Sequence, residues 1–174
     1  MVLQVTIVVG NPRAGSRTRT VAETLVQKLL EPGGYELEVV ELADHSGSVF
    51  DWASAEVRAL NDRVAASDLA VFATPTYKAS YTGLLKAFLD RYPANGLAGV
   101  TAIPVHTGGD LTHSLAPTVT LAPLLVELGA IVPGRGLYFV ADQIDRVDEI
   151  VGHAAAEYAA NLGRLSVVEA AVRR

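Results

Sequence analysis

The chain has 174 residues, of which 50% are hydrophobic and 19% charged, and it contains no cysteine. This length favours one domain over residues 1–174, and this composition excludes a disordered chain, disulfides and thiolate metal sites. The formal net charge of −5 argues against nucleic acid or an anionic membrane surface as a partner.

The first half of the chain predicts three strands and two helices. Residues 5–9 form a β-branched run typical of a strand buried on both faces, and residues 21–30 carry apolar side chains at helical spacing. Residues 35–39 alternate apolar and acidic, which favours a strand nearer a sheet edge. A second helix is expected over residues 53–64 and an apolar strand over residues 69–73.

The second half continues the same alternation. We expect helices over residues 84–89, 121–128 and 147–162, with strands over residues 100–105 and 137–140 between them. Five strands alternating with five helices predict parallel βαβ units with right-handed crossovers. The expected fold is therefore α/β: a flavodoxin-like three-layer sandwich with a five-stranded parallel sheet of order 2-1-3-4-5 and helices on both faces.

Two residues carry local predictions within this pattern. Pro104 lies in the fourth predicted strand and removes a ladder donor, so we expect a bulge or bend there. Asp145 is the expected N-cap of the last helix.

No membrane or export segment is expected. The apolar N-terminus has no preceding Lys or Arg, and the longest uncharged stretch, residues 111–126, is short for a bilayer span and contains Pro117 and Pro123. We expect a cytoplasmic protein.

The loop after the first strand concentrates basic and polar residues. In a doubly wound sheet, ligands bind at the carboxyl ends of the strands, and the first helix begins at this loop. Backbone N–H groups, hydroxyls and guanidinium groups suit a phosphate, although a capped helix start with solvated arginines remains the alternative. The residues concerned are Asn11, Arg13, Ser16, Arg17, Thr18 and Arg19.

The loops after the third and fourth strands are unusual too. Residues 74–83 contain Tyr77, Lys78 and Tyr81, which suit a planar ring, although an ordinary βα loop with packed tyrosines is an equal alternative. Residues 106–110 contain paired glycines that permit close backbone approach to a ligand, or simply a tight turn. Three such loops at one sheet edge are a stronger argument than any one loop.

These loops resemble those of the NAD(P)H-dependent FMN reductase family, in particular the flavin reductases of two-component alkanesulfonate monooxygenase systems. The resemblance covers roughly residues 3–142 and rests on GNPRAGSRT, ATPTYKASYTGLLKAFLD and TGGDLTHSLA. It implies a flavodoxin-like enzyme, usually dimeric or tetrameric, that transfers hydride from NAD(P)H to flavin.

The resemblance also implies three groups of flavin contacts. The residues that would hold the FMN phosphate are Arg13, Ser16 and Thr18. The residues that would line the isoalloxazine are Pro75, Thr76, Tyr77 and Lys78. The residues that would face its other edge are Thr107, Gly108 and Gly109.

Two positions depart from the family pattern. Asn11 stands where the family usually has Ser, and Asn can still donate to a phosphate. Val119 aligns with an aromatic, commonly Tyr, that flavin-donating reductases often carry in a bulged turn. Pro123 cannot donate to the Val119 carbonyl, so a local break in the helix is still expected.

Direct hydride transfer between nicotinamide and flavin requires no side-chain acid, base or nucleophile, so no catalytic side chain is expected. No metal site is expected, because His106 and His113 lack further ligands at metal spacing. The first interpretation is an FMN reductase, which would act with a flavin-dependent monooxygenase and form a homodimer or homotetramer. The alternatives are a quinone or azo-compound reductase with permanently bound FMN and, in a different class, a flavodoxin-like electron carrier.

Overall fold

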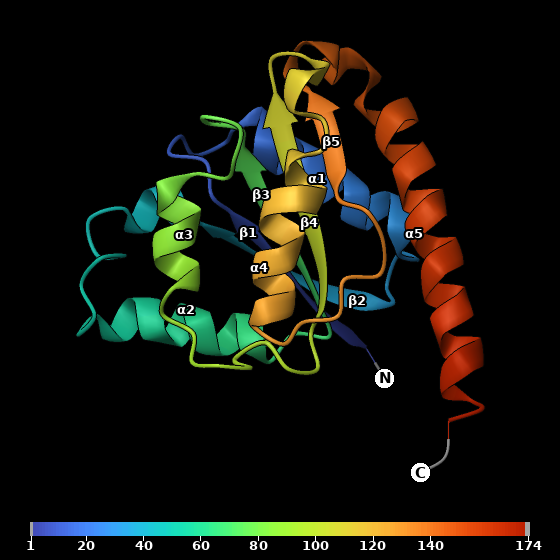
Figure 1. Ribbon diagram of the computed structural model, residues 1–174, viewed down its shortest axis with the longest axis horizontal. Coiled ribbons are helices and arrows are strands. Elements are labelled where there is room, and N and C mark those ends of the chain that lie inside the picture. The colour runs from blue at the N-terminus through green and yellow to red at the C-terminus, as the bar shows by residue number, and fades with distance from the viewer. Residues whose placement is uncertain (1, 173–174) are drawn as a thin grey trace.

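The computed structural model describes residues 2–172 of the chain. Five parallel strands form one sheet in the order β2-β1-β3-β4-β5, as predicted. The strands are β1 (Leu3–Val9), β2 (Tyr35–Glu41), β3 (Leu69–Pro75), β4 (Thr101–Gly108) and β5 (Leu137–Val140). β2 lies at an edge of the sheet, as its alternating sequence predicted, and the fully apolar strands lie inside it (Figure 1).

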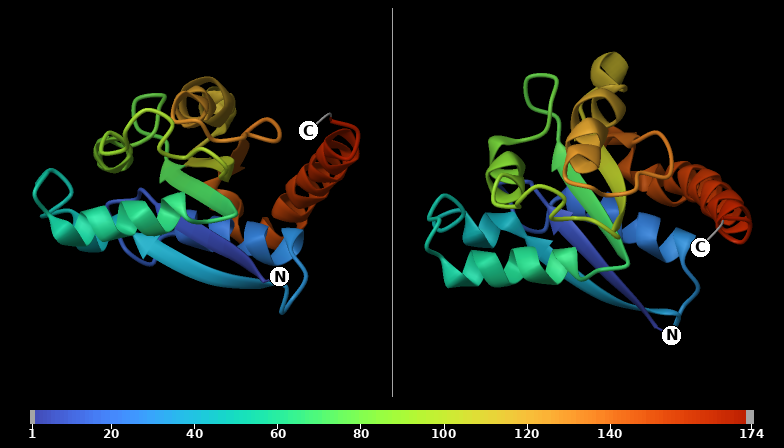
Figure 2. Two further views of the ribbon diagram at one scale, coloured as in Figure 1. Left: turned by 90° about the horizontal axis from the view of Figure 1, so that it is seen from below. Right: turned by 60° about the horizontal axis from the view of Figure 1, so that its bottom comes forward.

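Helices cover both faces of this sheet. They are α1 (Arg17–Leu29), α2 (Ala55–Ala65), α3 (Gly83–Leu89), α4 (Ala122–Glu127) and α5 (Val147–Glu169). Figure 2 shows α2 and α3 on one side of the sheet and α1 and α5 on the other. The apolar core is divided accordingly: Phe72 and Phe88 belong to one layer, and Ile7, Leu25 and Phe139 to the other. Within residues 2–172, no helix is both long enough and apolar enough to span a bilayer.

Pro104 does not make the predicted bulge. It pairs in regular register with Phe72 of β3 and is buried within β4. Ala102 donates its N–H to Ile131 on the β5 side, and the alternation along a strand directs the Pro104 nitrogen to that same side. Since β5 begins only at Leu137, opposite Val105, no strand residue needs a hydrogen-bond donor from Pro104.

The segment before α4 contains the expected break. Residues Pro117–Leu121 form a π-helical turn (η3), in which the Ala122 N–H donates to the Pro117 carbonyl five residues back. Pro123 has no N–H for the Val119 carbonyl, which explains why the ordinary helical ladder fails here. The Val119 side chain is exposed.

Asp145 is not the N-cap of the last helix. A 3₁₀ segment, η4 (Ala141–Arg146), leads directly into α5, and Arg146 occupies the N-cap position without a side-chain cap bond. Because the preceding 3₁₀ turn continues into the helix, no capping side chain is needed. α5 also continues beyond the predicted end at residue 162.

Candidate functional site

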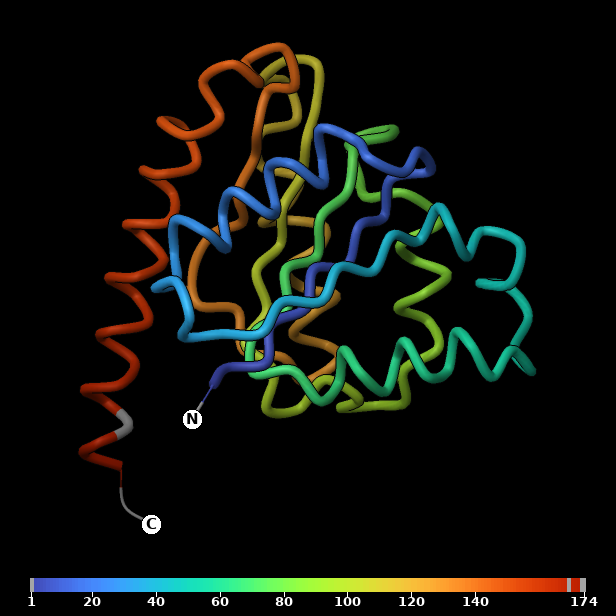
Figure 3. The backbone as a smooth tube through the Cα atoms, turned by 180° about the vertical axis from the view of Figure 1, so that it is seen from behind, coloured from blue at the N-terminus to red at the C-terminus, as the bar shows by residue number. Residues whose placement is uncertain are grey.

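The loops after β1, β3 and β4 meet at the carboxyl edge of the sheet, as Figure 3 shows from behind. They enclose an open cleft of about 570 Å³, within the usual size range of small-molecule sites. Its lining residues are Asn11, Arg13, Ala14, Gly15, Ser16, Arg17, Thr18, Pro75, Thr76, Tyr77, Thr107, Gly108, Gly109 and Ala141. The structure therefore brings eleven of the twelve predicted site residues together.

Lys78 is the predicted residue that does not line this cleft. Tyr77 and Ser80 exchange backbone hydrogen bonds of 2.9 and 3.1 Å, so Lys78 and Ala79 form the tip of a tight hairpin turn. Both tip residues have positive φ, 52° and 64°, which is unfavourable for residues with a Cβ. Strained backbone of this kind concentrates at binding sites.

The N-terminus of α1 opens into the cleft. Ser16 is the N-cap, and its Oγ accepts a hydrogen bond from the Arg19 N–H at 3.4 Å. The first turn of α1 contains no acidic residue, so its partial positive charge is not neutralised from within the helix. Gly15, just before the cap, has φ +62°, a conformation that favours glycine.

Thr18 joins the first loop to the end of β4. Its hydroxyl lies 2.8 Å from the Thr107 hydroxyl and accepts a hydrogen bond from Asn11 Nδ2 at 3.1 Å. Asn11 Oδ1 in turn accepts the Arg13 N–H at 2.9 Å. Thr18 is buried, so this network fixes the floor of the cleft before any ligand enters.

The three arginines of the first loop do not converge, contrary to the prediction of one basic cluster. Arg17 pairs with Asp142 at 3.2 Å, and Arg19 pairs with two glutamates at 2.9 and 2.8 Å. The hydrogen bonds that Arg19 donates to Glu41 and then to Glu23 raise the pKa of Arg19, which does not line the cleft. Of these three arginines, Arg13 is therefore the one that has no ion pair within residues 2–172.

Thr82 attaches the second loop to the first. Its hydroxyl donates to the Gly10 carbonyl at 2.6 Å and accepts the Leu85 N–H at 3.1 Å as the N-cap of α3. Of the two predicted ring-stacking residues, Tyr77 is 53% exposed and lines the cleft, whereas Tyr81 packs against the core beside α3.

His106 lies directly beneath the cleft. It is fully buried in β4, and its Nδ1 lies 3.2 Å from the hydroxyl of the lining residue Thr76. Its Nε2 has no hydrogen-bond partner within residues 2–172. Burial lowers the pKa of His106 to about 4, so the imidazole is neutral at neutral pH.

The wall formed by the third loop depends on a side chain from β5. Tyr138 donates its hydroxyl to the Asp110 carbonyl at 2.8 Å, which fixes the loop after Gly108. A Cβ added at Gly108 would lie 1.8 Å from the Tyr138 hydroxyl oxygen, so glycine is required for this close approach. At Gly109 a Cβ would meet no atom within 4 Å, because that position borders open space.

Three lining residues were not predicted: Ala14, Gly15 and Ala141. Gly15 lies inside the loop that we identified from its arginines, and a glycine in such a loop is the sequence signal that could have identified it. Ala14 and Ala141 have no side-chain chemistry that the sequence could reveal. Ala141 follows β5, which β3 and β4 separate from β1, and the structure brings it to the first loop through Arg17, whose guanidinium donates to the Ala141 carbonyl at 3.2 Å.

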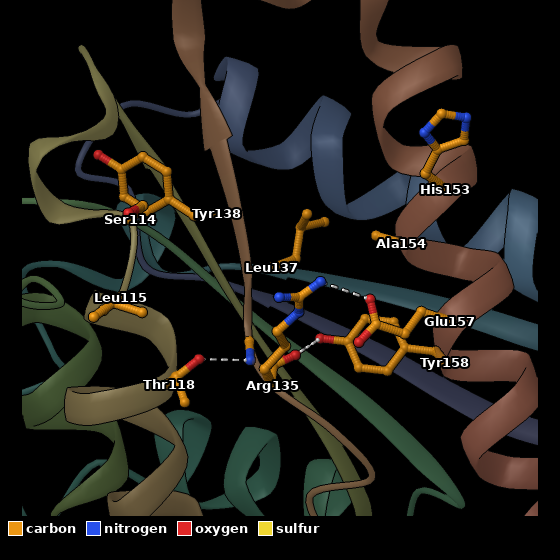
Figure 4. Close-up of a pocket in the computed structure, with 11 residues that line it drawn as sticks. Ser114, Leu115, Thr118, Arg135, Leu137, Tyr138, His153, Ala154, Glu157 and Tyr158 are labelled. Carbon is orange, nitrogen blue, oxygen red and sulfur yellow. Dashed lines mark hydrogen bonds and ion pairs between the residues drawn. The ribbon is translucent and has the colours of Figure 1, made fainter.

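A second cavity of about 340 Å³ lies between β5, α5 and the segment before α4 (Figure 4). Its polar groups are largely satisfied by one another: Arg135 pairs with Glu157 at 3.1 Å, and the Tyr158 hydroxyl donates to the Arg135 carbonyl at 2.7 Å. The cleft at the sheet edge is therefore the stronger candidate for a charged ligand. No group of three or more potential metal ligands occurs in the described part of the chain.

Comparisons with known proteins find similar sequences over most of the chain. The family model described as NADPH-dependent FMN reductase matches residues 3–145. The chain is 32% identical to an FMN reductase (NADPH) of Escherichia coli K12 over 130 residues, which are 74% of this chain and 68% of that protein. It is 33% identical to the NADH-dependent FMN reductase SfnF of Pseudomonas putida over 151 residues, 83% and 81% of the two chains.

A solved structure is also similar over most of this chain. The apo form of the NADH:FMN oxidoreductase EMOB superposes with a TM-score of 0.79 at 30% identity, and the match covers 90% of this chain and 88% of the other.

Proposed function

This chain belongs to the NADPH-dependent FMN reductase family, and on that premise we propose that FMN occupies the cleft between its three loops and is reduced there by NAD(P)H. The protein is an NAD(P)H-dependent flavin oxidoreductase, as the family and its relatives imply. The observation that carries the assignment of the site is the convergence of eleven predicted residues, from three loops distant in sequence, on one cleft.

The donors at the cleft fit the two ends of FMN. A phosphate suits the N-terminus of α1, the Ser16 hydroxyl and the Arg13 guanidinium, which offer partial and full positive charge. A planar ring suits Pro75, Tyr77 and the backbone of Gly108 and Gly109, where a narrow wall without side chains permits close approach.

When bound, FMN supplies the redox chemistry by accepting a hydride from the nicotinamide. The residues of this chain bind and orient the flavin. Thr76, Tyr77 and Thr107 line the same cleft, and their backbone positions are fixed by the Thr82–Gly10 and Thr18–Thr107 hydrogen bonds. The Thr76 and Tyr77 N–H groups already donate to the Thr107 and Ser80 carbonyls, so backbone donors that stabilise negative charge on the reduced ring must come from neighbouring residues of these loops.

We assign the finer properties by analogy and by surface chemistry. Relatives named FMN reductase, SfnF among them, support flavin as the electron acceptor, and the resemblance of the three loops to two-component systems supports delivery of the reduced flavin to a monooxygenase. Four apolar side chains within residues 111–126 are each more than half exposed, and this exposure supports a homodimer or homotetramer: Leu111, Leu115, Val119 and Val126. The need for reduced nicotinamide favours the cytoplasm as the site of action.

The test is NADPH and NADH oxidation followed by absorbance with and without added FMN. We expect turnover that depends on added FMN. Colour retained through purification, with turnover of quinones or azo compounds independent of added FMN, would instead indicate a reductase with permanently bound flavin. If neither nucleotide is oxidised with any of these acceptors, the enzymatic assignment is wrong and the electron-carrier alternative remains.

The phosphate assignment is tested by Arg13→Ala. Because Arg13 carries the charge of the loop that has no ion pair within residues 2–172, its removal should weaken FMN binding about tenfold. Riboflavin lacks the phosphate and should bind both proteins alike. An equal loss for FMN and riboflavin would remove Arg13 from phosphate recognition.

A further inference from the structure

A buried carboxylate is attached to the underside of the first loop. Glu41, the last residue of β2, is only 7% exposed. Its two oxygens accept the Gly15 N–H at 3.0 and 3.2 Å, and its Oε1 also accepts a hydrogen bond from Arg19 Nη1 at 2.8 Å. An anion of the protein itself is therefore bound to the loop in which we propose that the FMN phosphate binds.

This contact holds the loop in a defined shape. Gly15 has left-handed backbone geometry and lies directly before the Ser16 N-cap, so its N–H has no helical partner. The Glu41 carboxylate satisfies that donor from the side of the sheet, and the Asn11–Arg13 bond closes the other end of the loop. The loop is thus preorganised without a ligand, which reduces the ordering cost of binding.

The same contact reduces the attraction of the loop for an anion. Glu41 and Glu23 both pair with Arg19, and Asp142 pairs with Arg17. Three carboxylates are thus paired with two of the three arginines of this segment, and only Arg13 has no ion pair within residues 2–172. A phosphate monoester brings up to two further negative charges at neutral pH, and Glu41 lies among the groups nearest the loop backbone.

We propose that Glu41 is a built-in counter-anion that keeps the phosphate loop formed while weakening its hold on FMN, so that FMN is exchanged as a substrate rather than retained. This inference rests on the proposed function, because it assumes that the flavin phosphate binds at the Arg13–Ser16 loop. Glu41 is a positioning residue: it acts through Gly15 and Arg19 and does not line the cleft.

The test compares FMN and riboflavin affinity in Glu41→Gln, measured by the change in flavin fluorescence. The Gln amide oxygen can still accept the Gly15 N–H, so the substitution removes the charge but keeps the contact. We expect FMN to bind about tenfold more tightly and to remain with the protein through gel filtration, because one like charge near the phosphate is gone. Riboflavin affinity should change less than about twofold, since it carries no phosphate.

Glu23→Gln is the matched control. It removes the same charge from the same arginine, but Glu23 makes no hydrogen bond to the Arg13–Ser16 loop. We expect its effect on FMN affinity to be clearly smaller than that of Glu41→Gln. Equal tightening by both variants, or unchanged FMN affinity in Glu41→Gln, would overturn the proposal.

Arg19→Gln provides a test of opposite sign if Glu41→Gln does not fold. It leaves the Glu41 charge without its partner, so FMN should bind about tenfold more weakly than to the wild type, whereas riboflavin should bind with wild-type affinity. Unchanged FMN binding would again overturn the proposal. If wild-type protein binds neither flavin, the proposed function itself fails, and this result is distinguishable from both outcomes above.

Discussion

The buried His106 predicts a loss of stability in mild acid. It is fully buried, and burial lowers its pKa to about 4 in the folded protein. In the unfolded chain an imidazole takes up its proton near pH 6.5. Between these values the unfolded state binds more protons than the folded state, so a falling pH favours unfolding.

The magnitude follows from the two pKa values. His106 has a pKa of about 4 in the folded state and about 6.5 in the unfolded state. The free energy of unfolding should therefore fall by about 2 kcal/mol between about pH 8 and about pH 5, and by about 3 kcal/mol once both states are protonated. The contribution is therefore present above the unfolded pKa and is lost as the pH falls towards the folded one. For a domain of this size, such a change is a large fraction of the total free energy of unfolding.

The assay is urea denaturation of the wild type and His106→Asn at several pH values across this range. Asn can still reach the Thr76 hydroxyl but does not titrate, so its free energy of unfolding should fall by about 2 kcal/mol less than that of the wild type. His153→Asn, which changes an exposed histidine on α5, should follow the wild-type curve. Parallel pH profiles for the wild type and His106→Asn would refute the assigned protonation of His106.

Two further predictions concern the loops around the cleft. Gly108→Ala places a Cβ against the Tyr138 hydroxyl and should displace that ring. We expect the free energy of unfolding, measured by urea denaturation, to fall by about 1–3 kcal/mol, and flavin binding to weaken. Wild-type values for both would contradict the geometry. Thr82→Ala removes the N-cap of α3 and the hydrogen bond to Gly10, which should lower the free energy of unfolding by about 1–2 kcal/mol. Thr82→Ser keeps the hydroxyl and should retain most of that stability. Equal urea midpoints for the two variants would contradict this role.

The fold was predictable because its signals are local. The β-branched run in β1 and the alternation in β2 distinguish an inner strand from an edge strand, and the count of βα units then favours one strand order. The break before α4 was also predictable, since Pro123 removes a specific donor from the chain. The start of α5 was not, because a 3₁₀ segment replaces the side-chain cap expected at Asp145.

The lining of the cleft was largely predictable, but its electrostatics were not. Sequence spacing shows three arginines close together and predicts that they act as one basic group. Their partners come from elsewhere: Glu41 ends β2 and Asp142 follows β5, so only the folded sheet brings these carboxylates to the loop. Arg13, the arginine left without an ion pair within residues 2–172, cannot be distinguished from the others by sequence alone.

Pro104 lies at the point of β4 where pairing with the fifth strand begins. A strand forms a regular hydrogen-bonded ladder only where its neighbour provides both backbone donors and acceptors. On the β5 side, Pro104 has no N–H to donate. β5 begins opposite the next residue, Val105, and has only four residues. The start of β5 therefore coincides with the residue of β4 that lacks a donor, and the segment before it contains Pro133, Gly134 and Gly136, which also disfavour a strand. A proline buried in an inner strand is tolerated here because no strand residue on the β5 side requires its missing N–H.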